Sequence, residues 1–233
     1  MKIKEAIILA GGFGTRLQPV LKDIPKAMAD INGKPFLSYL VSFLVKHGID
    51  HIILGLGFKA EIIKSYFGAN PFKAQITCSV EDKPLGTGGA TKKALKYVKG
   101  EGAFILNGDT FFEIDLGKLC SSYESSGAEV AMALKKVPDC YRYDSVALDA
   151  DHRVINFTPR KARQEGLING GIQIISRHAL DDMPEAFSFE NDFLMKKFDK
   201  IKISGCVFDS YFIDIGIPED YEKAKEDFKK FKY

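Results

Sequence analysis

Short hydrophobic runs alternate along the first half of the chain with stretches in which hydrophobic residues recur every three or four positions. The runs are typical of strands, most of them buried, and they lie at 5–9, 51–57, 74–80, 103–109 and 129–137. The periodic stretches predict helices at 35–48, 59–68 and 88–98. Strands that alternate with helices predict an α/β fold, in which a mostly parallel central sheet carries helices on both faces.

The second half is denser in strands, which are predicted at 145–149, 153–157, 170–175 and 202–208. The final stretch, 218–233, begins with a proline and carries mixed charge, so it predicts a terminal helix with one solvated face. The sequence contains no repeat, low-complexity tract or linker. We therefore expect residues 1–233 to form a single domain with a small inserted substrate-binding lobe.

The charge of the chain argues against several classes of partner. Its 233 residues carry a formal net charge of +2, with 45% hydrophobic and 27% charged residues, so no basic excess indicates nucleic acid. The hydrophobic stretch Ala6–Ala10 is far too short for a signal peptide core or a membrane span, so no membrane partner is expected. The four cysteines are scattered without metal-ligand spacing, and we expect reduced thiols in a cytoplasmic protein.

A glycine-rich segment follows the first predicted strand. Gly11, Gly12 and Gly14 stand where ligands bind in parallel α/β sheets, and glycine N–H groups can face an anion without intervening side chains. Arg16 offers a planar fork for phosphate oxygens, and Lys26 offers a mobile point charge. The segment predicts a triphosphate site. Taken alone, it leaves open a glycine-rich turn with two surface cations.

Two aspartates end hydrophobic runs elsewhere in the chain. Asp109 closes the run 103–109, and Asp214 closes a short run just before a glycine. Either carboxylate alone is more often a turn residue or a helix cap. Two carboxylates at strand ends beside a phosphate loop suit Mg²⁺, which takes one or two carboxylates together with phosphate oxygens. We therefore expect Mg²⁺ as a cofactor that bridges the phosphates of nucleotide and substrate.

Six ordered motifs give the chain a family resemblance. They are GGFGTR (11–16), PK (25–26), PLGTGGA (84–90), LNGD (106–109), NGG (169–171) and FIDIGIPEDY (212–221). In this order they resemble the sugar-1-phosphate nucleotidyltransferases over nearly the whole chain. The segments most similar to the bacterial branch that guanylylates D-glycero-D-manno-heptose 1-phosphate are SVEDKPLGTGGA, NGDTFFEIDL, FSFENDFL and YFIDIGIPEDY. The resemblance implies a Rossmann-like sheet without the left-handed β-helix of longer relatives.

The resemblance also implies a reaction, in which a phosphate oxygen of a sugar 1-phosphate attacks the α-phosphorus of a nucleoside triphosphate. In the heptose branch GTP and D-glycero-α-D-manno-heptose 1-phosphate would give GDP-heptose and pyrophosphate. The implied catalytic residues are Arg16, Lys26 and Asp109. Arg16 would hold the departing pyrophosphate, and Lys26 would stabilise the charge that builds on the α-phosphate. Asp109 and Asp214 would hold Mg²⁺.

Substrate contacts follow from the same resemblance. The loop Leu9–Gly12 and the stretch Glu81–Thr87 would clasp the base, and Asn169 and Gly170 would face the sugar. The nucleotide-binding residues implied by the motifs are Leu9, Gly11, Gly12, Gly14, Thr15, Glu81, Pro84, Gly86, Thr87 and Gly108.

One position departs from the family pattern. Relatives usually carry a Glu-Lys pair after a segment like RVINF (153–157), whereas here Pro159 takes the glutamate position and Arg160 the lysine position. The sugar phosphate is then expected to meet Arg160, or Lys161 if the loop shifts by one residue. The missing glutamate removes an acceptor for sugar hydroxyls, so the sequence leaves the identity of the sugar open. Exposed loop charges are the alternative for both cations.

Glu81 bears on the choice of base. A carboxylate only accepts hydrogen bonds, and guanine offers two adjacent donors where uracil and thymine offer one. This favours GTP, and a solvated charge in the run EDK (81–83) is the alternative. The rival functions are a uridylyl- or cytidylyltransferase acting on another sugar 1-phosphate, and a catalytically silent nucleotide-binding regulatory subunit. The oligomeric state, including a homo-oligomer, stays open.

Overall fold

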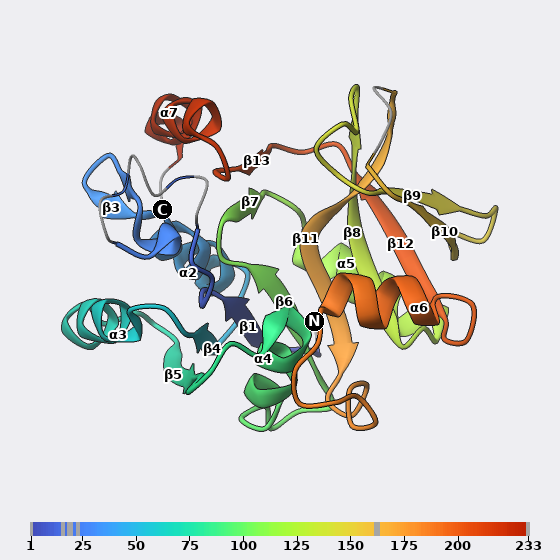
Figure 1. Cartoon of the computed structure of the whole chain (residues 1–233), viewed down its shortest axis with the longest axis horizontal. Coiled ribbons are helices and arrows are strands. Elements are labelled where there is room, and N and C mark those ends of the chain that lie inside the picture. Colours follow the sequence, from blue (N-terminus) through green and yellow to red (C-terminus); the bar gives the residue numbers. More distant parts are fainter. Residues whose placement is uncertain (1, 15–16, 18–20, 22–23, 161–163, 232–233) are drawn as a thin grey trace.

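The computed structural model describes residues 2–14, 17, 21, 24–160 and 164–231, and its first half alternates strands with helices (Figure 1). The longer elements of this half are β1 (Glu5–Leu9), α2 (Phe36–Lys46), β4 (His51–Leu56), α3 (Ala60–Ala69), β5 (Gln75–Val80), α4 (Gly86–Leu95), β6 (Gly102–Asn107) and α5 (Leu116–Ser126). The short ones are the 3₁₀ turn η1 (Lys26–Met28), β2 (Asp30–Ile31), β3 (Lys34–Pro35) and β7 (Thr110–Phe112).

Strands dominate the second half. They are β8 (Val130–Val137), β9 (Ser145–Leu148), β10 (Val154–Thr158), β11 (Gly166–Ser176), β12 (Ile203–Phe208) and β13 (Phe212–Asp214). The helical elements are the π-helix η2 (Phe189–Leu194), α6 (Met195–Lys197), α7 (Pro218–Asp227) and the 3₁₀ turn η3 (Phe228–Lys230).

The central sheet joins a parallel part to an antiparallel extension. Strands β6, β1, β4 and β5 run parallel in that spatial order. Strand β11 pairs antiparallel with β6 and β8, and β12 runs parallel to β8. The first part of β11 also pairs with β9, and β9 pairs with β10, so β9 and β10 extend the sheet beyond its parallel part (Figure 1).

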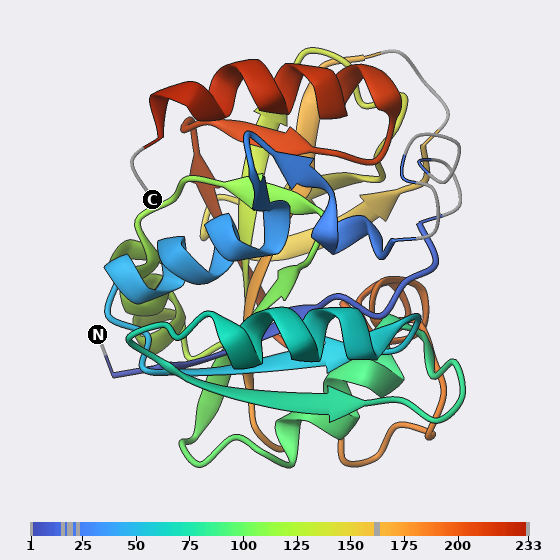
Figure 2. The same ribbon diagram turned by 90° about the vertical axis from the view of Figure 1, so that its left-hand side faces the viewer.

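Hydrophobic cores lie on both faces of the sheet because successive side chains of a strand point to opposite faces. Ala6 and Ile8 of β1 belong to the core that also contains buried residues of α2, α3, α5 and α7. Ile7 belongs to the second core, with residues of α4 and η2. Figure 2 shows α7, α2 and α3 stacked on the side facing the viewer. The expected α/β fold with helices on both faces is therefore confirmed.

Several boundaries differ from the sequence-based expectation. Strand β11 covers eleven residues rather than the six at 170–175, because its first half pairs with β8 and β9 outside the parallel core. Helix α7 ends at Asp227, well before the expected 233, and a 3₁₀ turn follows it. Within the described ranges, no helix has both the length and the hydrophobicity needed to cross a membrane.

A buried polar cluster connects the amino end of β1 to β4, β5 and the loop after α4 through hydrogen bonds. The Glu5 carboxylate accepts hydrogen bonds from the N–H groups of Lys99 (2.9 Å) and Gly100 (2.6 Å), and it lies 2.7 Å from His51 Nδ1. His51 Nε2 lies 2.9 Å from Thr77 Oγ1. Burial raises the pKa of Glu5, but the hydrogen bonds from Gly100, His51 and Lys99 outweigh burial and leave that pKa below its ordinary value.

We expect Glu5→Gln to lower the free energy of unfolding at pH 7 by about 1–3 kcal/mol, because buried donors lose their charged acceptor. Because the pKa of Glu5 is lower in the folded than in the unfolded state, its charge stabilises the fold at pH values above the unfolded-state pKa. This stabilisation is lost as the pH falls through the folded-state pKa. Urea unfolding should therefore show the gap between wild type and variant narrowing below pH ~4. The exposed control Glu101→Gln should unfold like wild type. Equal stability of wild type and Glu5→Gln at pH 7 would contradict this account.

Candidate active site

A cleft of about 690 Å³ opens at the carboxyl ends of the parallel strands. The loop after β1, the ends of β4 and β6, and the start of α4 line it. Many residues that the sequence motifs assign to the nucleotide lie on its wall: Leu9, Gly11, Gly12, Gly14, Lys26, Glu81, Pro84, Gly86, Thr87, Gly108 and Asp109. The structure thus brings the glycine loop, the PLGT segment and the LNGD segment to one cavity, as parallel-sheet geometry predicts.

Close backbone approaches shape the floor of this cleft. A Cβ atom at Gly108 would lie 2.5 Å from the carbonyl oxygen of Leu9, and one at Gly11 would lie 2.9 Å from the nitrogen of Gly57. Neither position has room for a side chain unless the neighbouring backbone moves. Glycine at these two places therefore lets the ends of β1, β4 and β6 converge under the cavity.

Lys26 is a buried cation between two carboxylates. Its side chain is only 10% exposed, and its Nζ lies 2.7 Å from Asp109 Oδ2 and 3.7 Å from Asp214 Oδ1. Pro25 precedes the 3₁₀ turn that begins at Lys26, and it fixes the backbone where the lysine enters the cleft. The ammonium group thus compensates two negative charges that would otherwise repel each other.

Strand pairing brings the two aspartates together. Asp214 ends β13, which pairs antiparallel with β7 so that Asp214 lies opposite Thr110, the residue after Asp109. The N–H of Ile215 also donates to the carbonyl oxygen of Asp109, at 3.0 Å. Two residues 105 positions apart in the sequence are therefore held side by side by main-chain hydrogen bonds.

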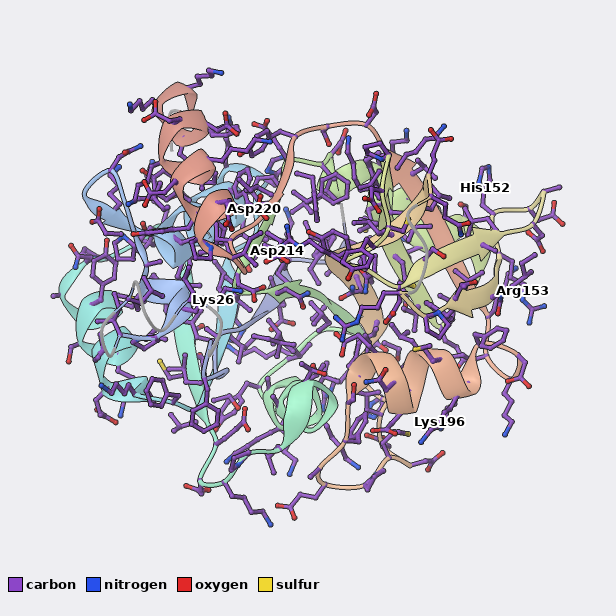
Figure 3. The ribbon with its side chains drawn as sticks, turned by 45° about the horizontal axis from the view of Figure 1, so that its top comes forward. Lys26, His152, Arg153, Lys196, Asp214 and Asp220 are labelled. Atoms are coloured by element: carbon purple, nitrogen blue, oxygen red, sulfur yellow. The ribbon has the colours of Figure 1, made fainter. Side chains whose placement is uncertain are left out.

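Asp214 is the more buried of the two aspartates, with a side chain 16% exposed against 39% for Asp109. Burial and the nearby charge of Asp109 raise the pKa of Asp214, and the charges of Lys26 and Arg142 oppose the rise in part. Its buried Oδ1 atom lies 3.7 Å from Lys26 Nζ and has no hydrogen-bond donor at bonding distance among the described residues. Arg142 reaches the other oxygen, with Nη2 at 3.7 Å from Oδ2, while its Nη1 binds Asp220 at the start of α7. Figure 3 shows Lys26 and Asp214 near one another and close to Asp220, which lies in the first turn of α7.

The oxygen atoms that the cluster offers as ligands determine whether it can hold a metal ion. Within the ranges that the structure describes, no three His, Cys, Asp or Glu side chains gather around one point. Mg²⁺, however, commonly takes one or two carboxylates and completes its shell with water and substrate phosphates. Asp109 and Asp214 offer such a pair of carboxylates, and the Oδ1 of Asp214 has no hydrogen-bond donor within the described part of the chain. The cluster therefore fits Mg²⁺ that arrives with phosphate oxygens, and it does not resemble an all-protein metal cage.

Glu81 follows β5 and lies on the wall of the cleft. Its Oε2 accepts a hydrogen bond from the N–H of Leu85 at 2.8 Å, which fixes the carboxylate beside the glycine loop. Burial raises its pKa, and the Leu85 N–H and the charge of Lys93 lower it in part. The remaining oxygen, Oε1, is directed at Gly11, with 3.1 Å to a Cβ built there. Glu81 is thus a partly buried acceptor, not a fully solvated charge.

A second cavity of about 160 Å³ adjoins the cleft and shares Asn107 and Glu190 with it. Asn169, expected to face the sugar, lines this smaller cavity. Gly170 lines neither cavity and packs against the ring of Phe112.

Other predicted residues are placed differently. Arg160 is exposed and lines neither cavity, although its N–H donates to Asp144 Oδ1 at 3.0 Å. Thr15, Arg16 and Lys161 lie outside the described residues. The structure therefore brings together Lys26, the two aspartates and most of the residues predicted to bind the nucleotide, and it leaves the exposed Arg160 outside both cavities.

Sequence reasoning missed three charged residues of this region. Arg142 touches Asp214, whereas Asp144 and Glu190 line the smaller cavity. The segment CYRYD (140–144) shows neither periodicity nor a motif, so only the folded chain reveals its two charges. Glu190 belongs to FSFENDFL, which carries family resemblance without pointing to a role for the glutamate.

Comparison with known proteins places this geometry in a family. The sequence profile of the nucleotidyl transferase family matches residues 5–230. The chain is 48% identical to the D-glycero-alpha-D-manno-heptose 1-phosphate guanylyltransferase of Campylobacter jejuni, over 93% of this chain and 96% of that protein. It is 45% identical to the protein of the same name from Aneurinibacillus thermoaerophilus, over 97% of this chain and 99% of that one.

Solved structures agree with the sequence comparison. HddC from Yersinia pseudotuberculosis superposes with a TM-score of 0.88 at 42% identity, over 97% of this chain and 100% of that one. The same protein complexed with GMP-PN gives a TM-score of 0.87. With a profile match over nearly its full length and relatives well above 30% identity, the chain belongs to the nucleotidyl transferase family.

Proposed function

We propose that the chain transfers GMP from GTP to D-glycero-α-D-manno-heptose 1-phosphate and releases pyrophosphate. The observation that carries the proposal is the buried Lys26, held between Asp109 and Asp214 in a cleft lined by the glycine loop. Relatives at 48% and 45% identity that bear the name heptose 1-phosphate guanylyltransferase support the substrates. The GMP-PN complex of HddC supports a guanine nucleotide.

In this proposal the nucleotide occupies the larger cavity and the sugar the smaller one. The substrate's own phosphate oxygen is the nucleophile, so the protein needs to position the reactants and stabilise charge rather than form a covalent intermediate. Lys26 stabilises the charge that builds on the α-phosphate, and the N–H groups of residues 11–14 with Arg16 hold the leaving pyrophosphate. Asp109 and Asp214 would hold Mg²⁺, which would supply further charge neutralisation.

Base and sugar are recognised by different segments. Glu81 accepts from N1–H and the 2-amino group of guanine, while Leu9–Gly12 and Pro84–Thr87 enclose the base. Asn169 faces the sugar, and a contact of Arg160 or Lys161 with the sugar phosphate stays a prediction. We further propose that residues 1–233 act as one domain in the cytoplasm.

A pyrophosphate-release screen tests the proposal. Four nucleoside triphosphates are combined with a panel of sugar 1-phosphates that includes heptose, mannose, glucose and N-acetylglucosamine 1-phosphate. We expect the highest kcat/KM with GTP and the heptose, because guanine satisfies Glu81 best. Faster turnover with UTP or CTP would show the base assignment to be wrong, and no turnover with any pair would favour a silent regulatory subunit.

Glu81→Gln should weaken the preference for GTP. The amide oxygen keeps the bond to the Leu85 N–H, whereas the amide NH₂ then opposes the donors of guanine. A mismatched polar edge costs about 1–3 kcal/mol, so the ratio of kcat/KM for GTP to that for UTP should fall about 5- to 150-fold. The exposed glutamate variant Glu61→Gln is the control. An unchanged ratio in Glu81→Gln would remove Glu81 from base selection.

Asp214→Asn should separate activity from stability. Turnover should fall at least ~100-fold, and EDTA should abolish the activity of wild type. The raised pKa of Asp214 means that folding disfavours its charge, so the neutral amide should leave the melting temperature unchanged or higher. Thermal unfolding and Mn²⁺ binding in the presence of GTP are measured beside kinetics. Full activity of Asp214→Asn, or full wild-type activity in EDTA, would argue against the metal site.

A further inference from the structure

The smaller cavity combines polar groups with a hydrophobic wall. Its volume of about 160 Å³ is less than a quarter of the 690 Å³ cleft beside it, which suits a monosaccharide rather than a nucleotide. The hydrophobic part is made of Val146, Phe157, Leu194 and Met195. Such a wall packs against the C–H groups of a sugar ring, and polar groups around it then determine which hydroxyls fit.

Asn169 presents a donor to this cavity. Its Oδ1 accepts hydrogen bonds from the N–H of Gly171 (3.0 Å) and from Gln173 Nε2 (2.6 Å). These two bonds fix the amide, because an amide oxygen accepts while its NH₂ group only donates. Within the described ranges, the Nδ2 group of Asn169 has no hydrogen-bond partner, so it is available to a ligand.

Asp144 and Glu190 present acceptors in the same way. Asp144 Oδ1 accepts from the N–H of Arg160, and Glu190 Oε2 accepts from the hydroxyls of Thr87 (2.7 Å) and Ser188 (3.4 Å). Each carboxylate thus has one oxygen held by the protein. Within the part of the chain that the structure describes, the second oxygen of each has no hydrogen-bond partner. Both residues are half-buried and line the cavity, so a ligand bound there can reach their free oxygens.

The backbone around Glu190 holds it at the junction of the two cavities. Glu190 lies in the first turn of the π-helix η2, which begins after Ser188, whose hydroxyl accepts from the N–H of Asn191. π-helical turns are rare and frequently occur at functional sites. The bond to Thr87 connects this turn to the PLGT segment of the nucleotide cleft. Glu190 is therefore held from both sides of the cavity it lines.

The charge of the lining decides which part of a sugar phosphate fits here. No lysine or arginine is among the described residues that line the smaller cavity, whereas two carboxylates are. A phosphate dianion would be repelled, but neutral hydroxyl groups donate to carboxylates in strong, charge-assisted hydrogen bonds. Burial and the charge of Asp214 raise the pKa of Tyr143, another residue of this lining, to about 12. Its hydroxyl is therefore neutral at pH 7 and adds no charge to the cavity.

We propose that Asp144 and Glu190 are the specificity-determining acceptors for the hydroxyl groups of the sugar. The inference rests on the proposed sugar-1-phosphate guanylyltransferase activity and goes further by assigning the residues that read the sugar. Asn169 supplies the complementary donor, and the hydrophobic wall positions the ring. The sugar hydroxyls then lie between the free oxygens of Asp144 and Glu190, and the phosphate points to the cation of the larger cleft.

Asp144→Asn and Glu190→Gln test the assignment without removing the structural bonds. The amide oxygen of each variant still accepts from Arg160 N–H or from the Thr87 hydroxyl, while an NH₂ donor replaces the free acceptor oxygen. Steady-state kinetics with heptose 1-phosphate should show the sugar KM rising about 10- to 100-fold in each variant. The GTP KM should stay within about twofold of wild type.

The matched control is Asp139→Asn. Asp139 lies in the same loop and also accepts one backbone N–H, that of Tyr141, but it is exposed and lines neither cavity. Its sugar KM should equal that of wild type. Thermal unfolding of each variant checks the fold, and if Asp144→Asn loses stability, Glu190→Gln carries the test.

Three outcomes would overturn the inference. Unchanged sugar KM in Glu190→Gln would do so, as would GTP and sugar KM values that rise together. Wild type without turnover on any sugar 1-phosphate would overturn the proposed function and this inference with it. An active wild type with unaffected variants would overturn the inference alone.

Discussion

The arrangement of the active site depends on the buried ammonium group of Lys26. It is 2.7 Å from one carboxylate and 3.7 Å from another, and it joins segments that lie around residues 26, 109 and 214. Removing a charge of this kind from water is unfavourable unless partners compensate it. Here the partners are two aspartates, and burial together with the charge of Asp109 raises the pKa of Asp214. The charge of Lys26 is therefore compensated, whereas the charge of Asp214 is compensated only in part.

The incomplete compensation of Asp214 is the feature of the cluster that the proposed reaction uses. Among the described residues, the buried Oδ1 of Asp214 has no hydrogen-bond donor, and Arg142 lies 3.7 Å from its other oxygen. A group left unsatisfied in this way is costly to stability and is commonly retained for function. In the proposed reaction, phosphate oxygens and a divalent cation enter the cluster and complete what the protein leaves open.

Much of the fold was predictable because continuous hydrophobic runs mark strands that are buried on both faces. Strands β1, β4 and β6 fall where such runs end at glycine or polar residues, and that placed Gly11 and Asp109 at one edge of the sheet. The pairing of β7 with β13 was not predictable, because three-residue strands are too short to show periodicity. Yet this pairing sets Asp214 beside Asp109.

The sugar side of the site was the least predictable. Its charges come from an irregular loop and a π-helical turn, and their hydrogen bonds to Arg160 and Thr87 are visible only in the folded chain. Family motifs identified Asn169 but gave no reason to choose Asp144 or Glu190. Local sequence pattern thus located the elements proposed to hold phosphate, whereas only the tertiary packing located the proposed acceptors for sugar hydroxyls.

Asp109, Asp214 and Lys26 are proposed to form an incomplete cation site that nucleotide phosphates complete. Water proton relaxation, measured during Mn²⁺ titration of the wild-type protein with and without GTP, tests whether they do. We predict weak Mn²⁺ binding by the protein alone, because only two carboxylates are offered and Lys26 already compensates them. With GTP present, we predict a ternary complex with strong relaxation enhancement. Mn²⁺ binding that is equally tight without nucleotide, or no ternary complex with it, would contradict the account.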